Sequence, residues 1–106
     1  MTKKLIFLNT WLDYEFSIYE PSVQWDNVAG IYIFCKKTQP KEWVPYYIGK
    51  CDSFQDRIPS HERWDEAQAI GATHIHVLKV PQQLQRDSIE KELVKHFQPP
   101  LNKQLK

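Results

Sequence analysis

The sequence predicts an α+β fold that contains three strands and two helices, in the order strand, strand, helix, strand, helix. Apolar residues alternate with a period of two in three segments, recur at helical spacing near the C-terminus, and leave a polar loop between the first two strands. With 106 residues, of which 42% are apolar, the chain is long enough for one compact domain with a modest core.

The first two predicted strands, residues 30–36 and 44–49, form an antiparallel hairpin. Residues 37–42 between them are polar and include Pro40, which favours a loop that reverses the chain. In the second strand the alternation places Tyr46 and Ile48 on one face, and Tyr47 on the other. By the same alternation, Tyr32 of the first strand shares a face with Tyr47.

The first predicted helix begins at a capping signal. Asp52 or Ser53 is the expected N-cap, and the helix extends to about Ile70. Pro59 removes one backbone donor within this segment. The helix therefore either bends at Pro59 or has its regular part begin there.

The third strand and the second helix complete the predicted fold. Residues 73–80 alternate in polarity after Gly71, as expected for a strand. Residues 83–97 carry apolar side chains at helical spacing, and Pro99 and Pro100 end this helix.

Residues 1–28 are interpreted as an N-terminal extension that packs on a domain formed by residues 29–106. Residues 14–19 alternate well enough to add an edge strand. Trp11 and Trp25 are expected to pack on the core, and no chemistry is assigned to this extension.

Composition limits the location of the protein and its partners. No run of apolar residues is long enough for a secretory signal or a membrane span, and Cys35 and Cys51 lack the spacing of a zinc site or a disulfide framework. We therefore expect a soluble cytoplasmic protein with free thiols and no membrane partner. Because the formal net charge is only +1, any polyanion has to be bound by a local basic patch.

Two tripeptides and four further residues resemble the GIY-YIG nuclease superfamily. The tripeptides are Gly30-Ile31-Tyr32 and Tyr47-Ile48-Gly49, and Arg57, His61, Glu90 and Asn102 follow at the spacings usual in that superfamily. The resemblance covers about residues 29–103. It implies a small three-stranded antiparallel sheet flanked by helices, and a metal-dependent endonuclease that cuts DNA.

The resemblance also implies roles for the residues that carry it. Glu90 is expected to hold Mg²⁺ or Mn²⁺, because a hard cation needs only one protein carboxylate beside substrate oxygens. Arg57 is expected to contact phosphate through its planar guanidinium. Tyr32 and Tyr47 are expected to align or deprotonate the attacking water, with the choice of base left open, and His61 to relay a proton or donate to phosphate.

Ordinary structural roles remain as alternatives for the charged residues. Glu90 shares a helical stripe with apolar residues, but it could also be an exposed side chain paired with Arg86. Arg57 could bridge Asp52 or Asp56 on a solvated face.

Supporting roles are expected around this site. Gly30 and Gly49 allow a close approach of backbone or phosphate, or mark a bulge. Lys50, like Arg57, is a cation that could lower the pKa of a phenol, whose ordinary value is about 10. Asn102 orients the last helix or the site through its amide, or is only a turn residue.

The hairpin loop is longer than is usual in the superfamily. Lys36, Lys37 and Lys41 either form a DNA-contacting flap or decorate an insertion. His74 and His76 share a strand face, but no third ligand accompanies them, so a metal site there is not expected.

Two alternatives to catalysis remain: a nucleic-acid-binding module of the same fold that keeps phosphate affinity but does not cut, and a protein-interaction domain, which only the near-neutral charge suggests. If the chain is an endonuclease, its size favours weak sequence preference, with targeting supplied by the structure of the DNA, a partner protein or a homodimer.

Overall fold

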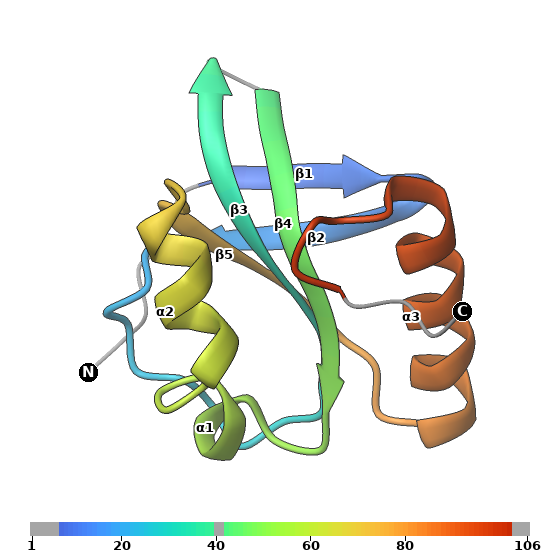
Figure 1. The fold of residues 1–106 in the computed structure, drawn as a ribbon. Helices are drawn as coiled ribbons and strands as arrows, with labels where there is room; N and C mark the ends of the chain where they lie inside the picture. Colours follow the sequence, from blue (N-terminus) through green and yellow to red (C-terminus); the bar gives the residue numbers. More distant parts are fainter. Residues whose placement is uncertain (1–6, 40–41, 103–106) are drawn as a thin grey trace.

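The computed structural model describes residues 7–39 and 42–102, which form one curled antiparallel sheet with helices on both faces (Figure 1). In chain order the elements are β1 (Phe7–Trp11), β2 (Tyr14–Tyr19), β3 (Gly30–Gln39), β4 (Glu42–Cys51), α1 (Phe54–Arg57), α2 (Glu62–Ala69), β5 (His74–Lys79) and α3 (Gln83–Phe97). Helices α1 and α2 cover one face of the sheet, and α3 covers the other.

The sheet has five strands in the order β1-β2-β5-β3-β4, which adds β1 and β2 to the three strands predicted after residue 29. After residue 29 the strands and helices follow the predicted order, except that two helices, α1 and α2, stand where one was predicted. Residues 14–19 do form a strand, but β2 lies between β1 and β5 and is therefore not an edge strand. The short β1 escaped prediction because Asn9 and Thr10 interrupt its apolar character. Trp11 and Trp25 are buried, as expected.

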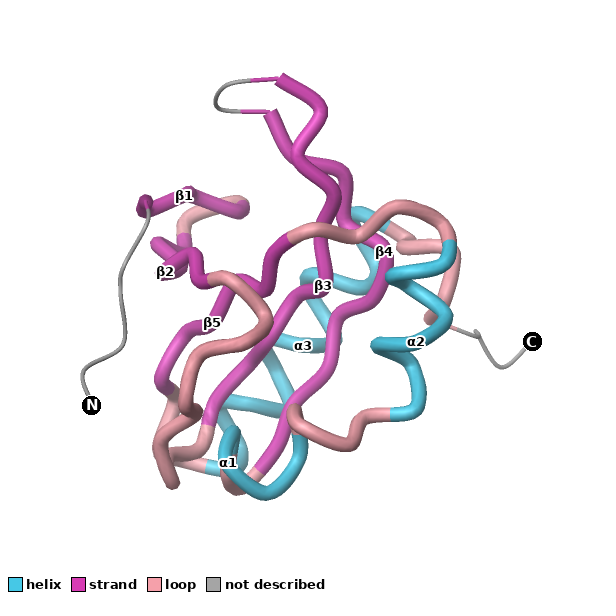
Figure 2. Tube along the Cα trace, turned by 90° about the vertical axis from the view of Figure 1, so that its left-hand side faces the viewer, coloured by secondary structure: helices cyan, strands magenta, loops and turns pink. Residues whose placement is uncertain are grey.

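The polar loop predicted at residues 37–42 is instead part of a long hairpin. Strand β3 continues to Gln39 and β4 begins at Glu42, with Lys37 paired to Trp43. In Figure 2 this hairpin extends beyond the other strands. The side chains of residues 36–39 are exposed, so their polarity does not prevent the backbone pairing.

The single helix predicted from residue 52 or 53 to about residue 70 is two helices. Ser53 caps the one-turn α1 by accepting a hydrogen bond from the Asp56 N–H, and α2 begins at Glu62 rather than at Pro59. The break follows from Pro59, which cannot donate a helical hydrogen bond. His61 restarts the helix as the N-cap of α2.

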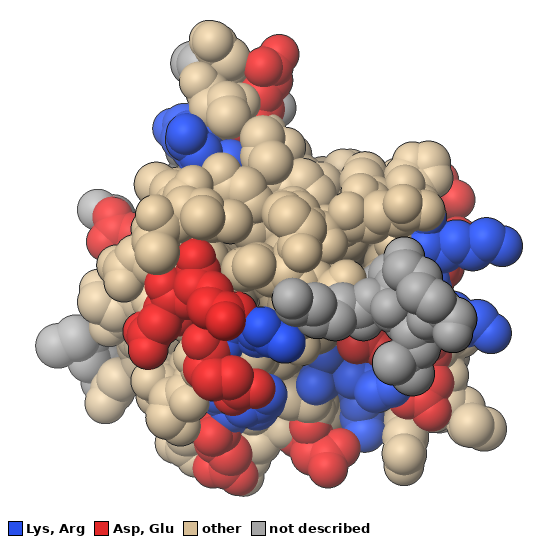
Figure 3. All heavy atoms as spheres, viewed as in Figure 1, with Lys and Arg blue, Asp and Glu red and all other residues tan. Residues whose placement is uncertain are grey.

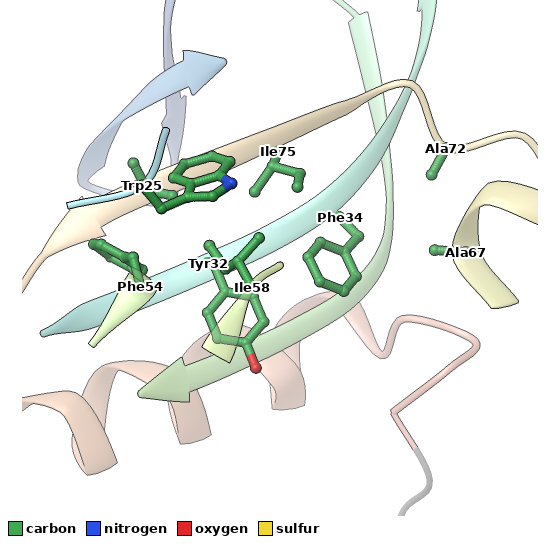
Figure 4. Close-up of a cluster of buried hydrophobic side chains, with 9 residues drawn as sticks. Trp25, Tyr32, Phe34, Phe54, Ile58, Ala67, Ala72 and Ile75 are labelled. Carbon is green, nitrogen blue, oxygen red and sulfur yellow. The ribbon is translucent and has the colours of Figure 1, made fainter. Parts of the chain in front are cut away.

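Residues 30–35 of β3 are buried on both faces of the sheet and separate two apolar clusters. The first lies under α1 and α2 and contains Trp25, Tyr32, Phe34, Phe54, Ile58, Ala67, Ala72, Ile75 and Val77 (Figure 4). The second lies under α3 and contains Trp11, Phe16, Ile31, Ile33, Cys35, Ile48, Val80 and Leu93. Alternate residues of β3 therefore serve opposite sides of the sheet.

A β-bulge changes one predicted orientation in β4. The register shifts between Phe34 and Cys35, so Tyr47 pairs with Phe34 while Pro45 pairs with Cys35. As a result, Tyr46 packs against the same cluster as Tyr47 instead of facing the side of Ile48.

His76 is a buried core residue. Its Nδ1 accepts a hydrogen bond of 2.9 Å from the Trp11 indole N–H, and Trp43 packs edge-on against its ring. Within residues 7–39 and 42–102, no group of three or more His, Cys, Asp or Glu side chains is arranged to hold a metal ion. The same residues include no helix with the length and apolar composition of a membrane span.

We predict that Gly30→Ala destabilises the fold. A methyl group at this position would overlap the Leu78 carbonyl oxygen and come within 2.6 Å of the Phe54 ring. Because one of these neighbours is sheet backbone, we expect a loss of about 2 kcal/mol or more in the free energy of unfolding. Urea denaturation measures it, and a loss of less than about 0.5 kcal/mol would contradict the packing described here.

Candidate active site

The two tyrosines and His61 lie together on the α1–α2 face of the sheet. The Tyr32 hydroxyl is 2.6 Å from His61 Nε2, and the Tyr47 ring centroid is 5.2 Å from the His61 ring and 6.2 Å from the Tyr32 ring. Figure 4 shows the Tyr32 ring within the apolar cluster and its hydroxyl at the margin. Tyr32 is 1% exposed, whereas Tyr47 is half-buried and reaches solvent.

The hydrogen bonds of His61 determine its tautomer. Its Nδ1 accepts a hydrogen bond of 2.9 Å from the Arg63 backbone N–H, in the capping position of α2. Neutral His61 therefore carries its proton on Nε2 and donates it to the Tyr32 oxygen. Tyr32 keeps its own O–H free to donate further.

His61 is neutral at physiological pH. Burial, with a further contribution from the Arg57 charge, lowers the pKa of His61 from 6.5 to about 4. The side chain is fully buried, so it reaches a substrate only through Tyr32 or Tyr47. This burial does not fit a direct contact of His61 with phosphate.

Neither phenol is activated in the free protein. Burial raises the pKa of Tyr32 well above its ordinary value, and it raises the pKa of Tyr47 as well. The Arg57 charge acts in the opposite direction on both groups, but burial has the larger effect. Both hydroxyls are therefore protonated at neutral pH and act first as hydrogen-bond donors.

Arg57, the last residue of α1, pairs with Glu62, the first residue of α2. Its Nη1 and Nη2 each lie 3.1 Å from one of the two Glu62 carboxylate oxygens. The alternative pairing with Asp52 is wrong, because the Asp52 carboxylate accepts a hydrogen bond of 2.9 Å from Arg86.

Glu90 lies on α3, on the opposite side of the sheet from His61. The alternative pair of Glu90 with Arg86 is also wrong, because Arg86 is buried and donates to Asp52 and to the carbonyl oxygens of Val80 and Pro81. Glu90 Oε1 instead lies 3.4 Å from the Lys50 ammonium, which is also 3.0 Å from Asp87 Oδ1.

The two sides of the sheet meet at β4, which is an edge strand. The side chains of Tyr47 and Lys50 point to opposite faces of the sheet. The negative charge of Glu90 still raises the pKa of Tyr47, so Glu90 acts electrostatically on Tyr47 around the strand edge. A depression of about 670 Å³ on the α3 side is lined by Lys50, Asp87, Glu90 and Asn102, among others. In Figure 3, Asp and Glu side chains gather over α2, next to Lys and Arg side chains.

Asn102 attaches the C-terminal segment to the free edge of β4. Its side-chain oxygen accepts from the Ile48 N–H at 2.8 Å, and its side-chain N–H donates to the Ile48 carbonyl at 2.7 Å. The Leu101 N–H donates to the Tyr46 carbonyl at 3.0 Å. The amide of Asn102 thus takes the place of a neighbouring strand.

The remaining glycine and isoleucine residues of the two tripeptides have packing roles. A methyl group on Gly49 would come within 2.5 Å of the Tyr32 hydroxyl, so glycine here lets Tyr32 cross the strand. Ile31 and Ile48 are buried on the α3 side. Lys36 and Lys37 are exposed on the hairpin, and Lys41 falls outside the described residues.

Sequence reasoning missed two carboxylates of the site, Glu62 and Asp87. Asp87 is three positions before Glu90 on α3, so helical spacing could have placed the two on neighbouring positions. Glu62 gave no such signal, because Pro59 interrupts the helical spacing between it and Arg57.

No protein-family model matches the chain, and no curated protein matches its sequence. Solved structures do match. The GIY-YIG N-terminal endonuclease domain of UvrC from Thermotoga maritima, bound to magnesium as its catalytic divalent cation, is 25% identical with a TM-score of 0.61, over 74% of this chain and 88% of that chain. An asparagine-to-alanine mutant of the same domain is 24% identical with a TM-score of 0.61, over 76% of this chain and 88% of that chain.

The chain has the GIY-YIG endonuclease fold. The structural likeness therefore agrees with the resemblance carried by the two tripeptides, which lie in β3 and β4. In this GIY-YIG fold, the tripeptides place Tyr32 and Tyr47 beside His61 and bring Gly49 under the Tyr32 hydroxyl.

We predict that acid destabilises the protein through His61. Since its pKa is about 4 when folded and 6.5 when unfolded, only the unfolded chain binds this proton between those values. Stability should therefore fall as pH decreases from 6.5 to 4, by up to about 1.4 kcal/mol per pH unit for this group. His76, whose pKa burial lowers to about 3, adds to the same effect.

Urea denaturation across this pH range measures the effect. His61→Asn keeps a capping side chain but cannot titrate, so its stability should depend less steeply on pH. His96→Asn, at an exposed histidine of α3, is the matched control and should keep the wild-type slope. Equal slopes for His61→Asn and the wild type would count against a buried neutral His61.

We predict that Asn102→Ala releases the segment that covers β4. The Ile48 N–H and C=O would lose both of their side-chain partners, at a cost of about 1–2 kcal/mol. Hydrogen exchange at the Ile48 amide should accelerate. Unchanged protection in Asn102→Ala would refute this role.

Proposed function

We propose that the protein is a metal-dependent endonuclease that hydrolyses phosphodiester bonds in DNA. The observation that carries this proposal is that three kinds of group lie near the β4 edge. They are the tyrosine hydroxyls with buried His61, the guanidinium of Arg57, and the Glu90 carboxylate in an open depression. Hydrolysis of a phosphodiester needs a positioned water, a counter-charge for the phosphate and help for the leaving oxygen. The structurally similar UvrC domain binds a catalytic magnesium ion, which supports the same chemistry here.

The residues around Glu90 fit a magnesium or manganese ion. The Glu90 side chain is 25% exposed, and the Lys50 ammonium already sits against Glu90 and Asp87, so this position attracts a cation. Mg²⁺ keeps most of its waters and needs few protein ligands, which suits a single carboxylate. Glu90 would hold the ion, which supplies positive charge against phosphate oxygens and makes its bound water more acidic.

The two tyrosines have different roles because they differ in solvent exposure. Tyr47 reaches solvent and is the hydroxyl that positions the attacking water, whereas Tyr32 is buried. Because His61 donates to the Tyr32 oxygen, the Tyr32 proton points away from His61 and stays available as a donor. Tyr32 and His61 therefore hold the geometry of the site and Tyr47 contacts the water.

Arg57 supplies the phosphate contact. Its two terminal nitrogens already bind two oxygens of one planar anion, which shows that the fork is presented in a bidentate geometry. The same geometry matches two oxygens of a phosphate. Because a module of this size offers too little surface for extensive base readout, we propose weak sequence preference, with a structured DNA, a partner protein or a second copy of the chain supplying the target.

A non-catalytic nucleic-acid-binding module is the alternative. Its phosphate site would have to tolerate Glu90 and Asp87, whose charges repel DNA unless a cation intervenes. A protein-interaction domain explains neither this pair of carboxylates nor the arginine fork. Cleavage assays separate the proposals.

We predict that the wild type nicks supercoiled plasmid or a branched duplex with Mg²⁺ and not with a chelator. Glu90→Gln and Arg57→Ala should each reduce the rate about 100-fold or more, because each removes charge that stabilises the transition state. Glu92→Gln is the matched control, since Glu92 lies on the same helix but pairs with Tyr14. Cleavage that survives Glu90→Gln would exclude the metal role, and DNA binding without any cleavage would favour the module.

A further inference from the structure

The phosphate-binding fork of Arg57 is occupied by a side chain of the protein itself. Glu62 places its two carboxylate oxygens 3.1 Å from Nη1 and Nη2 of Arg57, one oxygen for each nitrogen. A carboxylate and a phosphate both offer two oxygens to this fork, and both bind it bidentately. Glu62 therefore occupies the same donors that a phosphate of DNA would need.

The Glu62 carboxylate also lies inside the candidate site. Its Oε1 is 4.0 Å from His61 Nδ1, and its charge raises the pKa of Tyr47. The position of Glu62 as the first residue of α2, directly after the capping His61, fixes its backbone beside Arg57. The helix N-terminus favours a negative side chain there.

The Arg57–Glu62 ion pair can compete with phosphate for Arg57, and phosphate can also displace it. The side chains of Arg57 and Glu62 are 39% and 68% exposed, and ion pairs at such exposure contribute little to stability. Since the Arg57 hydrogen bond lowers the pKa of Glu62 to about 2, the carboxylate stays charged throughout the physiological pH range. The competition is therefore present at every pH at which the protein would act.

We propose that Glu62 is an internal competitor for phosphate, which DNA must displace from Arg57 before the site can act. This inference rests on the proposed function. A DNA that contacts the site through one phosphate alone gains little affinity when this phosphate replaces Glu62 on Arg57. A DNA that makes further contacts with the site binds tightly enough to displace Glu62. Glu62 thus raises the threshold for productive binding and makes the site selective for substrates that engage it as a whole.

The test is a double-mutant cycle on DNA affinity. A fluorescein-labelled branched duplex is titrated with protein by fluorescence anisotropy, with Ca²⁺ in place of Mg²⁺ so that a divalent cation is present while cleavage is suppressed. Glu62→Gln should raise the affinity roughly threefold to tenfold, because the neutral amide competes poorly for the guanidinium. In an Arg57→Ala background, the same substitution should change the affinity by less than about twofold.

Glu66→Gln is the matched control. Glu66 is a carboxylate of the same helix that pairs with Arg63 instead of Arg57, so its removal changes the net charge equally. We expect a change in affinity below about twofold for this variant. Glu62→Ala provides a second variant that also removes the competitor, and circular dichroism confirms that each variant folds.

Each remaining outcome decides the question. An equal gain from Glu62→Gln with and without Arg57 would mean that Glu62 only repels DNA at a distance, which overturns the proposal. No gain, or a loss, in Glu62→Gln when the wild type binds DNA overturns it as well, and would make Glu62 a support for Arg57. If neither the wild type nor any variant binds the duplex, the proposed function itself fails and this inference falls with it.

Discussion

The candidate site depends on one constraint: β4 is an edge strand whose side chains alternate between the two faces of the sheet from Tyr47 onward. Tyr47 joins the phenols and His61 on one face, and Lys50 joins Glu90 on the other. In the middle of a sheet these groups would be separated by the backbone of a neighbouring strand. At this edge no further strand of the described residues lies between the two sets, as the proposed contact of one phosphate with both requires.

That edge has to be kept from pairing with another chain, and the protein covers only part of it. Leu101 and Asn102 satisfy the backbone of Tyr46 and Ile48. The end of β4 beyond Ile48 carries Gly49 and Lys50, next to the depression that Glu90 lines. The C-terminal segment thus protects the strand and leaves the chemistry accessible. The charges at this end are balanced in pairs, Arg57 with Glu62 and Lys50 with Asp87 and Glu90.

Local patterns predicted the parts of the fold that are themselves local. The alternation of residues 30–35 and the helix at residues 83–97 follow from period and propensity, and both are present. The hairpin length and β1 were missed because cross-strand pairing there overrides a polar sequence. The candidate site residues were named from the spacing of the two tripeptides and the residues after them, and their roles stay predictions. The actual contacts of the site were not predicted: the Asn102–Ile48 hydrogen bonds and the Arg86–Asp52 ion pair join residues far apart in the chain, and the Arg57–Glu62 ion pair spans the helix break at Pro59.

The central claim is that one phosphate and one divalent ion meet at this edge, between Arg57 and Glu90. The most direct measurement is anomalous diffraction from crystals of the protein with a short duplex DNA and Mn²⁺. The account predicts an anomalous peak at the Glu90 carboxylate and a DNA phosphate on the Arg57 side of the β4 edge. A Mn²⁺ peak away from Glu90, or DNA bound along another surface with Arg57 still paired to Glu62, would contradict it.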